Sequence, residues 1–175
     1  MPSPHCNNRP HGCAVDLLVI HSISLPPGQY GGSYIDAFFL GQLDTGAHPY
    51  FSEIAALRVS AHLLIDRDGQ VTQYVPLDRR AWHAGQSEFQ GRSNCNDFSI
   101  GIELEGLDTD TYTDAQYRSL AEASAAIMAA YPAIDRDRIT GHSDIAPGRK
   151  LDPGPGFDWQ RYYSLLDEVV SGECH

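Results

Sequence analysis

The sequence predicts a single α/β domain in which a mixed central β-sheet is flanked by helices. The first reason is length, since 175 residues are typical of one domain with one core. The second is that short apolar strand patterns share the chain with long amphipathic helix patterns. The third is a β-hairpin signal inside this mixture, which predicts at least one antiparallel strand in the sheet.

The first predicted strand covers residues 16–22, DLLVIHS, a short apolar run bounded by polar residues. Because side chains alternate along a strand, His21 shares a face with Leu17 and Val19. Residues 23–57 follow as a long, partly helical loop with helical patterns near 34–40 and 51–57. Loops of this length in compact domains are usually functional, so we expect this segment to form a wall that recognises a ligand.

Residues 58–75 predict the hairpin, because two apolar runs flank Asp66-Arg67-Asp68-Gly69 and Asp-Gly is a strong turn signal. Residues 97–105, DFSIGIELE, predict a strand with Glu103 and Glu105 on its polar face.

The second half of the chain predicts two helices and one further strand. Residues 113–116 fit a capping box, and apolar residues then recur at helical spacing until Pro132. Residues 138–142, RITGH, predict a short strand that ends in His142, and 158–170 predict a closing helix.

The two ends of the chain are predicted to lie outside the domain. We expect an N-terminal arm at 1–14, a folded domain at 15–170 and a C-terminal tail at 171–175. The arm has no secretory pattern and is expected to be loose. It carries four potential ligands that match no recognisable zinc spacing: His5, Cys6, His11 and Cys13.

The composition restricts the partners. A formal charge of −11 argues against nucleic acid, and the absence of a long apolar run argues against a membrane span. Four cysteines are too few for a disulfide framework, so we expect reduced thiols and a cytoplasmic location. We also expect a monomer. Lys150 is the only lysine beside eleven arginines, which makes that position a candidate functional residue.

Three residues have side chains that zinc accepts, namely His21, His142 and Asp152. On residue type alone a structural role for each is more common than a metal site. A metal site becomes the favoured reading when five segments are considered together: VIHSISLPPGQYGG, LRVSAHLLIDRDG, WHAG, CNDFSIGIELEG and TGHSDIAPGRKLDPGPGFDW. In this order, and across nearly the whole chain, they resemble the cytoplasmic zinc N-acetylmuramoyl-L-alanine amidases, which are related to phage lysozyme type amidases and peptidoglycan recognition proteins.

The resemblance implies a zinc ion on His21, His142 and Asp152, with Glu103 and Lys150 as catalytic residues. Glu105 shares the face of Glu103 and is the alternative base. The implied reaction is hydrolysis of the amide between N-acetyl-1,6-anhydromuramic acid and L-alanine during peptidoglycan recycling. In this reading residues 15–170 form the amidase domain.

The implied substrate contacts involve five positions: Ser22, Arg58, His83, Asn94 and Arg149. Two of them depart from the family pattern, since related sequences carry asparagine at the position of Ser22 and arginine at that of Asn94. His62, in a hairpin strand, is expected to be structural. A noncatalytic peptidoglycan-binding module and a structural zinc protein are the alternative functions.

Overall fold

The computed structural model describes residues 1–172, so Cys174, His175 and most of the predicted tail lie outside the described residues. Its central sheet has the strand order β4-β3-β8-β2-β9. The bounds are β2 (Leu17–Ile23), β3 (Leu63–Ile65), β4 (Val71–Gln73), β8 (Ser99–Glu105) and β9 (Ile139–Gly141). Strands β3, β8, β2 and β9 pair in parallel, and β4 joins β3 antiparallel. The predicted mixed sheet and hairpin are therefore confirmed.

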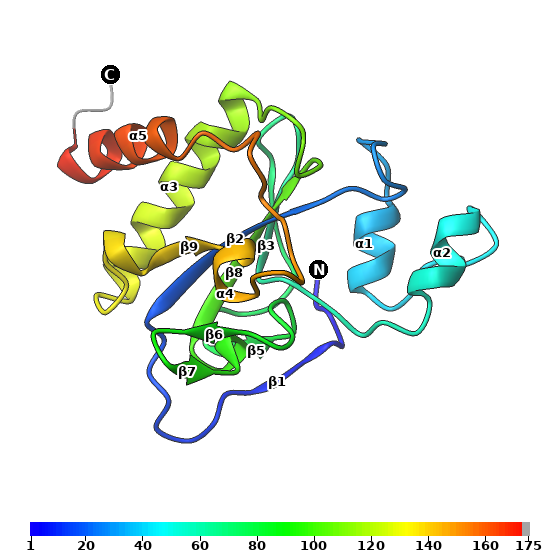
Figure 1. The fold of residues 1–175 in the computed structure, drawn as a ribbon, viewed down its shortest axis with the longest axis horizontal. Coiled ribbons are helices and arrows are strands. Elements are labelled where there is room, and N and C mark those ends of the chain that lie inside the picture. Colours follow the sequence, from blue (N-terminus) through cyan, green and yellow to red (C-terminus); the bar gives the residue numbers. More distant parts are fainter. Residues whose placement is uncertain (173–175) are drawn as a thin grey trace.

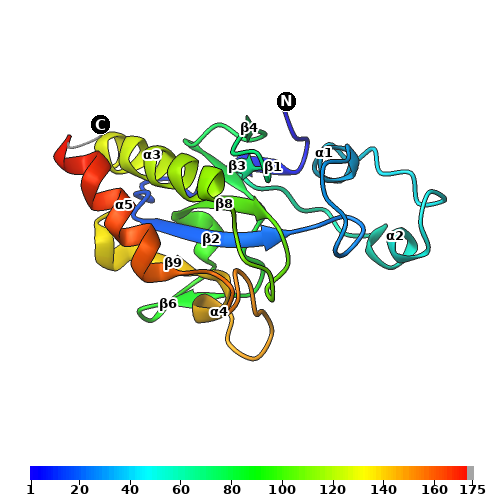
Figure 2. The same cartoon turned by 90° about the horizontal axis from the view of Figure 1, so that it is seen from above.

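One face of this sheet is covered by α3 (Asp114–Ala130) and α5 (Trp159–Ser171), which lie side by side in Figures 1 and 2. The side chains of β2 and β8 that face these helices are apolar up to the end of β2, where Ser22 follows on the same face. The apolar ones join one buried core: Leu18, Ile20, Ile100, Ile102 and Leu104. The predicted capping box starts α3, because Thr113 Oγ1 accepts from the Gln116 amide and the Gln116 side chain accepts from the Thr113 amide.

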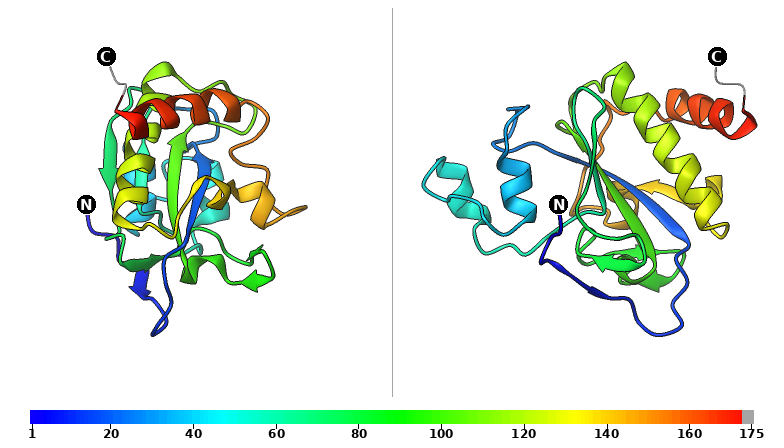
Figure 3. Two further views of the ribbon diagram at one scale, coloured as in Figure 1. Left: turned by 90° about the vertical axis from the view of Figure 1, so that its left-hand side faces the viewer. Right: turned by 180° about the vertical axis from the view of Figure 1, so that it is seen from behind.

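The opposite face of β2 and β8 carries the polar side chains. Leu17 and Val19 pack there in a smaller core, and His21 follows them on the same side. Helix α4 (His142–Ile145) begins directly after β9 and contributes Ile145 to this core. Two short helices, α1 (Tyr34–Phe39) and α2 (Pro49–Ile54), lie beyond the carboxyl end of β2 (Figures 2 and 3) and form the predicted helical parts of the 23–57 segment.

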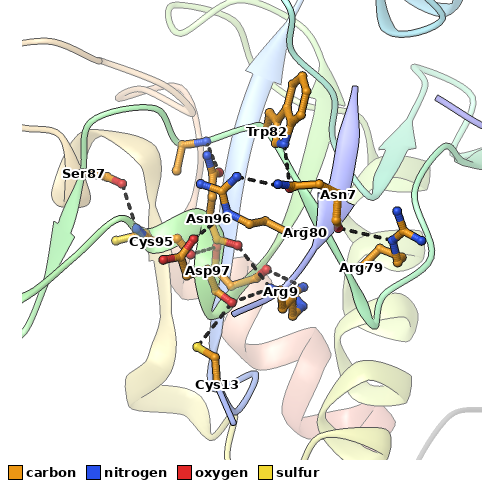
Figure 4. Close-up of polar contacts among 12 residues, drawn as sticks. Asn7, Arg9, Cys13, Arg79, Arg80, Trp82, Ser87, Cys95, Asn96 and Asp97 are labelled. Carbon is orange, nitrogen blue, oxygen red and sulfur yellow. Dashed lines mark hydrogen bonds and ion pairs between the residues drawn. The ribbon is translucent and has the colours of Figure 1, made fainter. Parts of the chain in front are cut away.

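The N-terminal arm is not loose, and that expectation was wrong. Strand β1 (Cys6–Asn8) pairs antiparallel with β5 (Arg79–Ala81). The Trp82 indole donates to Asn7 Oδ1 at 3.0 Å, which ties the arm to the WHAG segment (Figure 4). A second small hairpin, β6 (Glu88–Phe89) with β7 (Arg92–Ser93), lies nearby, followed by a 3-10 turn at Cys95–Asp97. A further turn at Arg136–Arg138 precedes β9.

Arg9 binds the arm to several distant segments of the domain. Its guanidinium donates to four backbone carbonyls, those of Asn96, Asp97, Leu77 and Ser99, at 2.9–3.2 Å. These carbonyls belong to the turn before β8, to Ser99 at its start and to the loop before β5, as Figure 4 shows in part. The arm therefore closes the side of the domain where β8 begins. Among residues 1–172, no helix has the length and apolar character needed to cross a membrane.

We expect Arg9→Ala to lower the free energy of unfolding by about 3 kcal/mol, because several carbonyls lose a charged donor. Urea denaturation measures this change. Arg136→Ala is the matched control, since Arg136 forms an exposed ion pair with Asp167 and its removal is expected to cost less than about 1 kcal/mol. Equal stabilities of the two variants would contradict the role of the arm.

Candidate active site

The strand register brings the predicted catalytic and metal residues together. In the parallel pair of β2 and β8, His21 lies opposite Glu103, and in the pair of β2 and β9, Ile20 lies opposite Gly141. Neighbouring strands are about 4.8 Å apart, so residues at one level of the sheet become neighbours. His142 directly follows Gly141 and therefore reaches the same level as His21.

Three potential ligand atoms meet at this point. His21 Nδ1 lies 2.9 Å from His142 Nδ1, and Asp152 Oδ2 lies 3.1 Å from the first and 3.0 Å from the second. The two histidines are almost fully buried, and Asp152 reaches them from the loop after α4. The predicted triad is thus assembled from the ends of two strands and one loop.

The protonation of these groups suits a cation. Burial, reinforced by the neighbouring His142, lowers the pKa of His21 to about 4, so the ring is neutral near pH 7. Burial alone would raise the pKa of Asp152, but hydrogen bonds to His142 and His21 outweigh it and hold this pKa below its usual value. The site therefore favours a neutral imidazole beside a carboxylate.

The donor set fits a tetrahedral metal ion. Ligand atoms that share one zinc ion with bonds of about 2.0–2.2 Å lie about 3.4 Å apart, so a few tenths of an ångström of outward movement would accommodate it. His142 Nε2 lies 3.1 Å from the Ala84 carbonyl and donates its proton there, which leaves Nδ1 free to act as a ligand. Three protein ligands leave a fourth position open, as catalytic zinc sites require.

Glu103 lies beside the triad and has an unused carboxylate oxygen. Its side chain is 8% exposed, and the buried Oε2 atom has no hydrogen-bond partner among residues 1–172. Burial, reinforced by the negative charge of Asp152, raises the pKa of Glu103 well above its usual value. A carboxyl group in this position can accept and hold a proton.

Glu105 occupies the same strand face but performs a different task. Its carboxylate accepts from the Gly31 amide at 2.7 Å and from the Arg67 amide at 3.2 Å. Glu105 thus fastens the start of the 23–57 segment to the hairpin turn. Because both oxygens have partners, Glu103 is the better candidate for proton transfer.

The triad and Glu103 open into a cavity of about 510 Å³. Lys150 lines it together with Ser22, and the 23–57 segment forms one wall through residues that include Phe38, Tyr50 and Leu57. Phe51, by contrast, is fully buried and anchors the segment to the core. The segment therefore has the position expected of a recognition wall.

The remaining predicted substrate residues are distributed unevenly. Arg149 lines this cavity and also a second one of about 500 Å³, where Asn94 lies. Arg58 is exposed and donates to the Ala55 and Leu57 carbonyls, so it lies outside the lining, next to two residues that belong to it, Leu57 and Val59. The structure thus brings Ser22, Arg149 and Lys150 to the triad, and Asn94 and Arg58 only to its surroundings.

Two of the other predicted histidines are buried in hydrogen-bond networks. His62 accepts from the Gly101 amide and donates to the Arg79 carbonyl, which confirms the structural role expected for it. His83 contacts His21 and lines the same cavity, but both of its ring nitrogens are bonded to protein atoms. No nitrogen of His83 is left for a hydrogen bond to substrate. Ser99, its second partner, lies within the CNDFSIGIELEG segment, but nothing in the sequence assigned a role to it.

Comparison with known proteins agrees with the geometry. The family described as N-acetylmuramoyl-L-alanine amidase matches residues 11–155. The chain is 60% identical over 171 residues to 1,6-anhydro-N-acetylmuramyl-L-alanine amidase AmpD of Escherichia coli, covering 98% of this chain and 93% of that protein.

Solved structures extend this likeness. A crystal structure of a selenomethionine AmpD derivative is 61% identical and has a TM-score of 0.93, covering 95% of this chain and 92% of that chain. AmpDh3 of Pseudomonas aeruginosa in complex with an anhydromuramic pentapeptide is 31% identical, with a TM-score of 0.65, and covers 89% of this chain and 61% of that chain. Together, the sequence match and the assembled histidine and aspartate site place this chain in the N-acetylmuramoyl-L-alanine amidase family.

Proposed function

We propose that this protein is a cytoplasmic, zinc-dependent amidase of peptidoglycan recycling. It hydrolyses the amide between N-acetyl-1,6-anhydromuramic acid and L-alanine in anhydromuropeptides. The observation that carries the proposal is the meeting of His21, His142 and Asp152 with the unpaired Glu103 carboxylate in one cavity. The activity in the name of the 60% identical relative and the anhydromuramic pentapeptide bound by AmpDh3 support the choice of substrate.

The three ligand residues would hold the zinc ion through His21 Nδ1, His142 Nδ1 and Asp152 Oδ2. When bound, zinc supplies Lewis acidity for activating water and polarising the amide carbonyl. Glu103 accepts a proton from the attacking water as the new carbon–oxygen bond forms. It then delivers this proton to the leaving nitrogen of L-alanine as the carbon–nitrogen bond breaks. The second proton of the water also passes to the amine, so the products are a lactyl carboxylate and a peptide with a free ammonium terminus.

Lys150 serves the same step through charge. Its side chain lines the cavity on the loop that also carries Asp152, two residues away. Its ammonium group stabilises the negative charge that develops on the carbonyl oxygen. The arginines near the cavity, Arg149 and Arg58, recognise carboxylates of the stem peptide, for which a guanidinium is the preferred partner. Ser22 and Asn94 complete the substrate contacts.

We expect the purified protein to hold about one zinc ion per chain, and His142→Ala to lose it, because two ligands bind zinc far more weakly than three. Elemental analysis after dialysis measures the metal. The exposed His11 provides the control, and His11→Ala should retain the ion. Stoichiometric zinc in His142→Ala at the affinity of the natural chain would contradict the ligand assignment.

We expect Glu103→Ala and Lys150→Ala to keep zinc and the fold but to lose turnover by about 100- to 1,000-fold each. Mass spectrometry of an anhydromuropeptide digest follows the reaction. Glu105→Gln is the control for a carboxylate on the same strand face, and it should lower stability more than turnover. Near-normal turnover of Glu103→Ala would move the proton-transfer role to Glu105, and inactivity of the unaltered protein on every anhydromuropeptide would favour a noncatalytic binder.

We expect Arg58→Ala and Arg149→Ala to lower kcat/KM by about tenfold for a tripeptide-bearing substrate, because each removes an ion pair to a peptide carboxylate. A substrate truncated to L-alanine is the internal control, since structural damage would reduce both rates alike. If the ratio of the two rates stays unchanged, these arginines do not recognise the peptide.

A further inference from the structure

A chain of hydrogen bonds runs from the metal ligand His21 into the protein. His21 Nε2 lies 2.8 Å from His83 Nδ1, and His83 Nε2 lies 3.0 Å from Ser99 Oγ. Ser99 Oγ in turn lies 2.5 Å from the Cys95 carbonyl oxygen. All these side chains are buried, with Ser99 fully so and His83 8% exposed.

The direction of every bond in this chain follows from its last member. A carbonyl oxygen can only accept, so the Ser99 hydroxyl donates to Cys95 and its oxygen accepts the proton of His83 Nε2. A neutral imidazole carries one proton, so His83 Nδ1 must accept from His21 Nε2. His21 is then left with a lone pair on Nδ1, the atom that points at His142 and Asp152.

The second histidine ligand is oriented from the neighbouring residue. His142 Nε2 donates to the Ala84 carbonyl, as described above. The backbone amides of both His83 and Ala84 donate to one atom, Asn96 Oδ1, at 3.0 and 2.8 Å. Asn96 therefore holds residues 83 and 84 in place. Each of these two residues accepts a hydrogen bond from the Nε2 atom of one histidine ligand, His83 from His21 and Ala84 from His142.

The His83 ring fits against the sheet because the residue beneath it in β8, Gly101, has no side chain. A Cβ atom on Gly101, in β8, would lie 2.5 Å from His83 Nδ1 and 2.6 Å from its Cγ. The ring therefore packs directly over the Gly101 backbone, between His21 and His62. This packing fixes the plane of the ring as well as its hydrogen bonds.

We propose that His83 is a positioning residue for the metal site, fixing the tautomer and the ring orientation of His21 through the chain that ends at Ser99 and Cys95. The inference rests on the proposed zinc site. It assigns His83 to the metal centre in place of the substrate contact expected from the sequence. A hydrogen-bonded partner of this kind typically changes metal affinity by about 10- to 100-fold when it is removed.

Zinc dissociation constants, measured by competition with a chromophoric chelator, test the proposal. We expect His83→Leu to weaken binding about 10- to 100-fold, because His21 loses the acceptor that fixes its tautomer. His83→Asn keeps an acceptor oxygen near the Nδ1 position and should stay within about threefold of the natural chain. His62→Leu is the matched control, a buried histidine beside His83 that contacts no ligand, and it should also stay within about threefold.

A second measurement is independent of metal binding. Nitrogen-15 chemical shifts of the imidazoles in the metal-free protein should report His21 as the Nε2–H tautomer. Ser99→Ala, a small change that removes the acceptor of His83, should convert His21 to a mixture of tautomers and weaken zinc binding severalfold. This variant decides the question if His83→Leu does not fold.

The outcomes separate the inference from the function on which it rests. Unchanged zinc affinity in His83→Leu, or unchanged tautomers and affinity in Ser99→Ala, would overturn the positioning role. Equal losses in His83→Asn and His83→Leu would overturn it too. Failure of the unaltered protein to bind zinc would instead contradict the proposed metal site, and the tautomer measurement would still decide whether His83 controls His21.

Discussion

Three atoms with lone pairs, His21 Nδ1, His142 Nδ1 and Asp152 Oδ2, lie within 3.1 Å of one another in a largely buried place. Such a cluster is unfavourable without a positive charge, since polar groups removed from water need a partner. The remaining structure can be understood as the means of holding these atoms together. The parallel register of β8, β2 and β9 sets two of them, and the loop after α4 brings the third.

The two faces of the sheet have different roles, since one packs in the core and the other bears the active site. The face under α3 and α5 supplies the main apolar core, in which all of β8 and the first five residues of β2 are buried. The other face carries His21 and Glu103, and the His83 ring packs against it over Gly101. His21 and His83 are hydrogen-bonded to each other, and Glu103 lines the cavity. Arg9 closes this side of the domain by binding the carbonyl of Ser99, the same residue whose hydroxyl ends the histidine chain. Ser99 therefore contacts both the N-terminal arm and the histidine chain.

The sequence was sufficient to predict the strand faces and the hairpin, because local periodicity and turn residues determine them. Alternation placed His21 and Glu103 on the correct strand faces, and Asp-Gly placed the hairpin. It failed for the arm, because Arg9 binds carbonyls 68–90 residues away and no local pattern encodes such contacts. Alternation places Glu103 and Glu105 on the same strand face and so does not distinguish their roles. The two roles differ because the amides of Gly31 and Arg67, from distant segments, donate to Glu105. The role of His83 was hidden for the same reason.

X-ray absorption spectroscopy of the zinc-loaded protein tests the central claim most directly, since it identifies the atoms bound to the metal. The account predicts two imidazole nitrogens, one carboxylate oxygen and one further oxygen at about 2.0–2.2 Å, with no sulfur. Sulfur ligands at about 2.3 Å, which could come only from cysteines such as Cys6 and Cys13, would contradict it and move the zinc away from His21, His142 and Asp152.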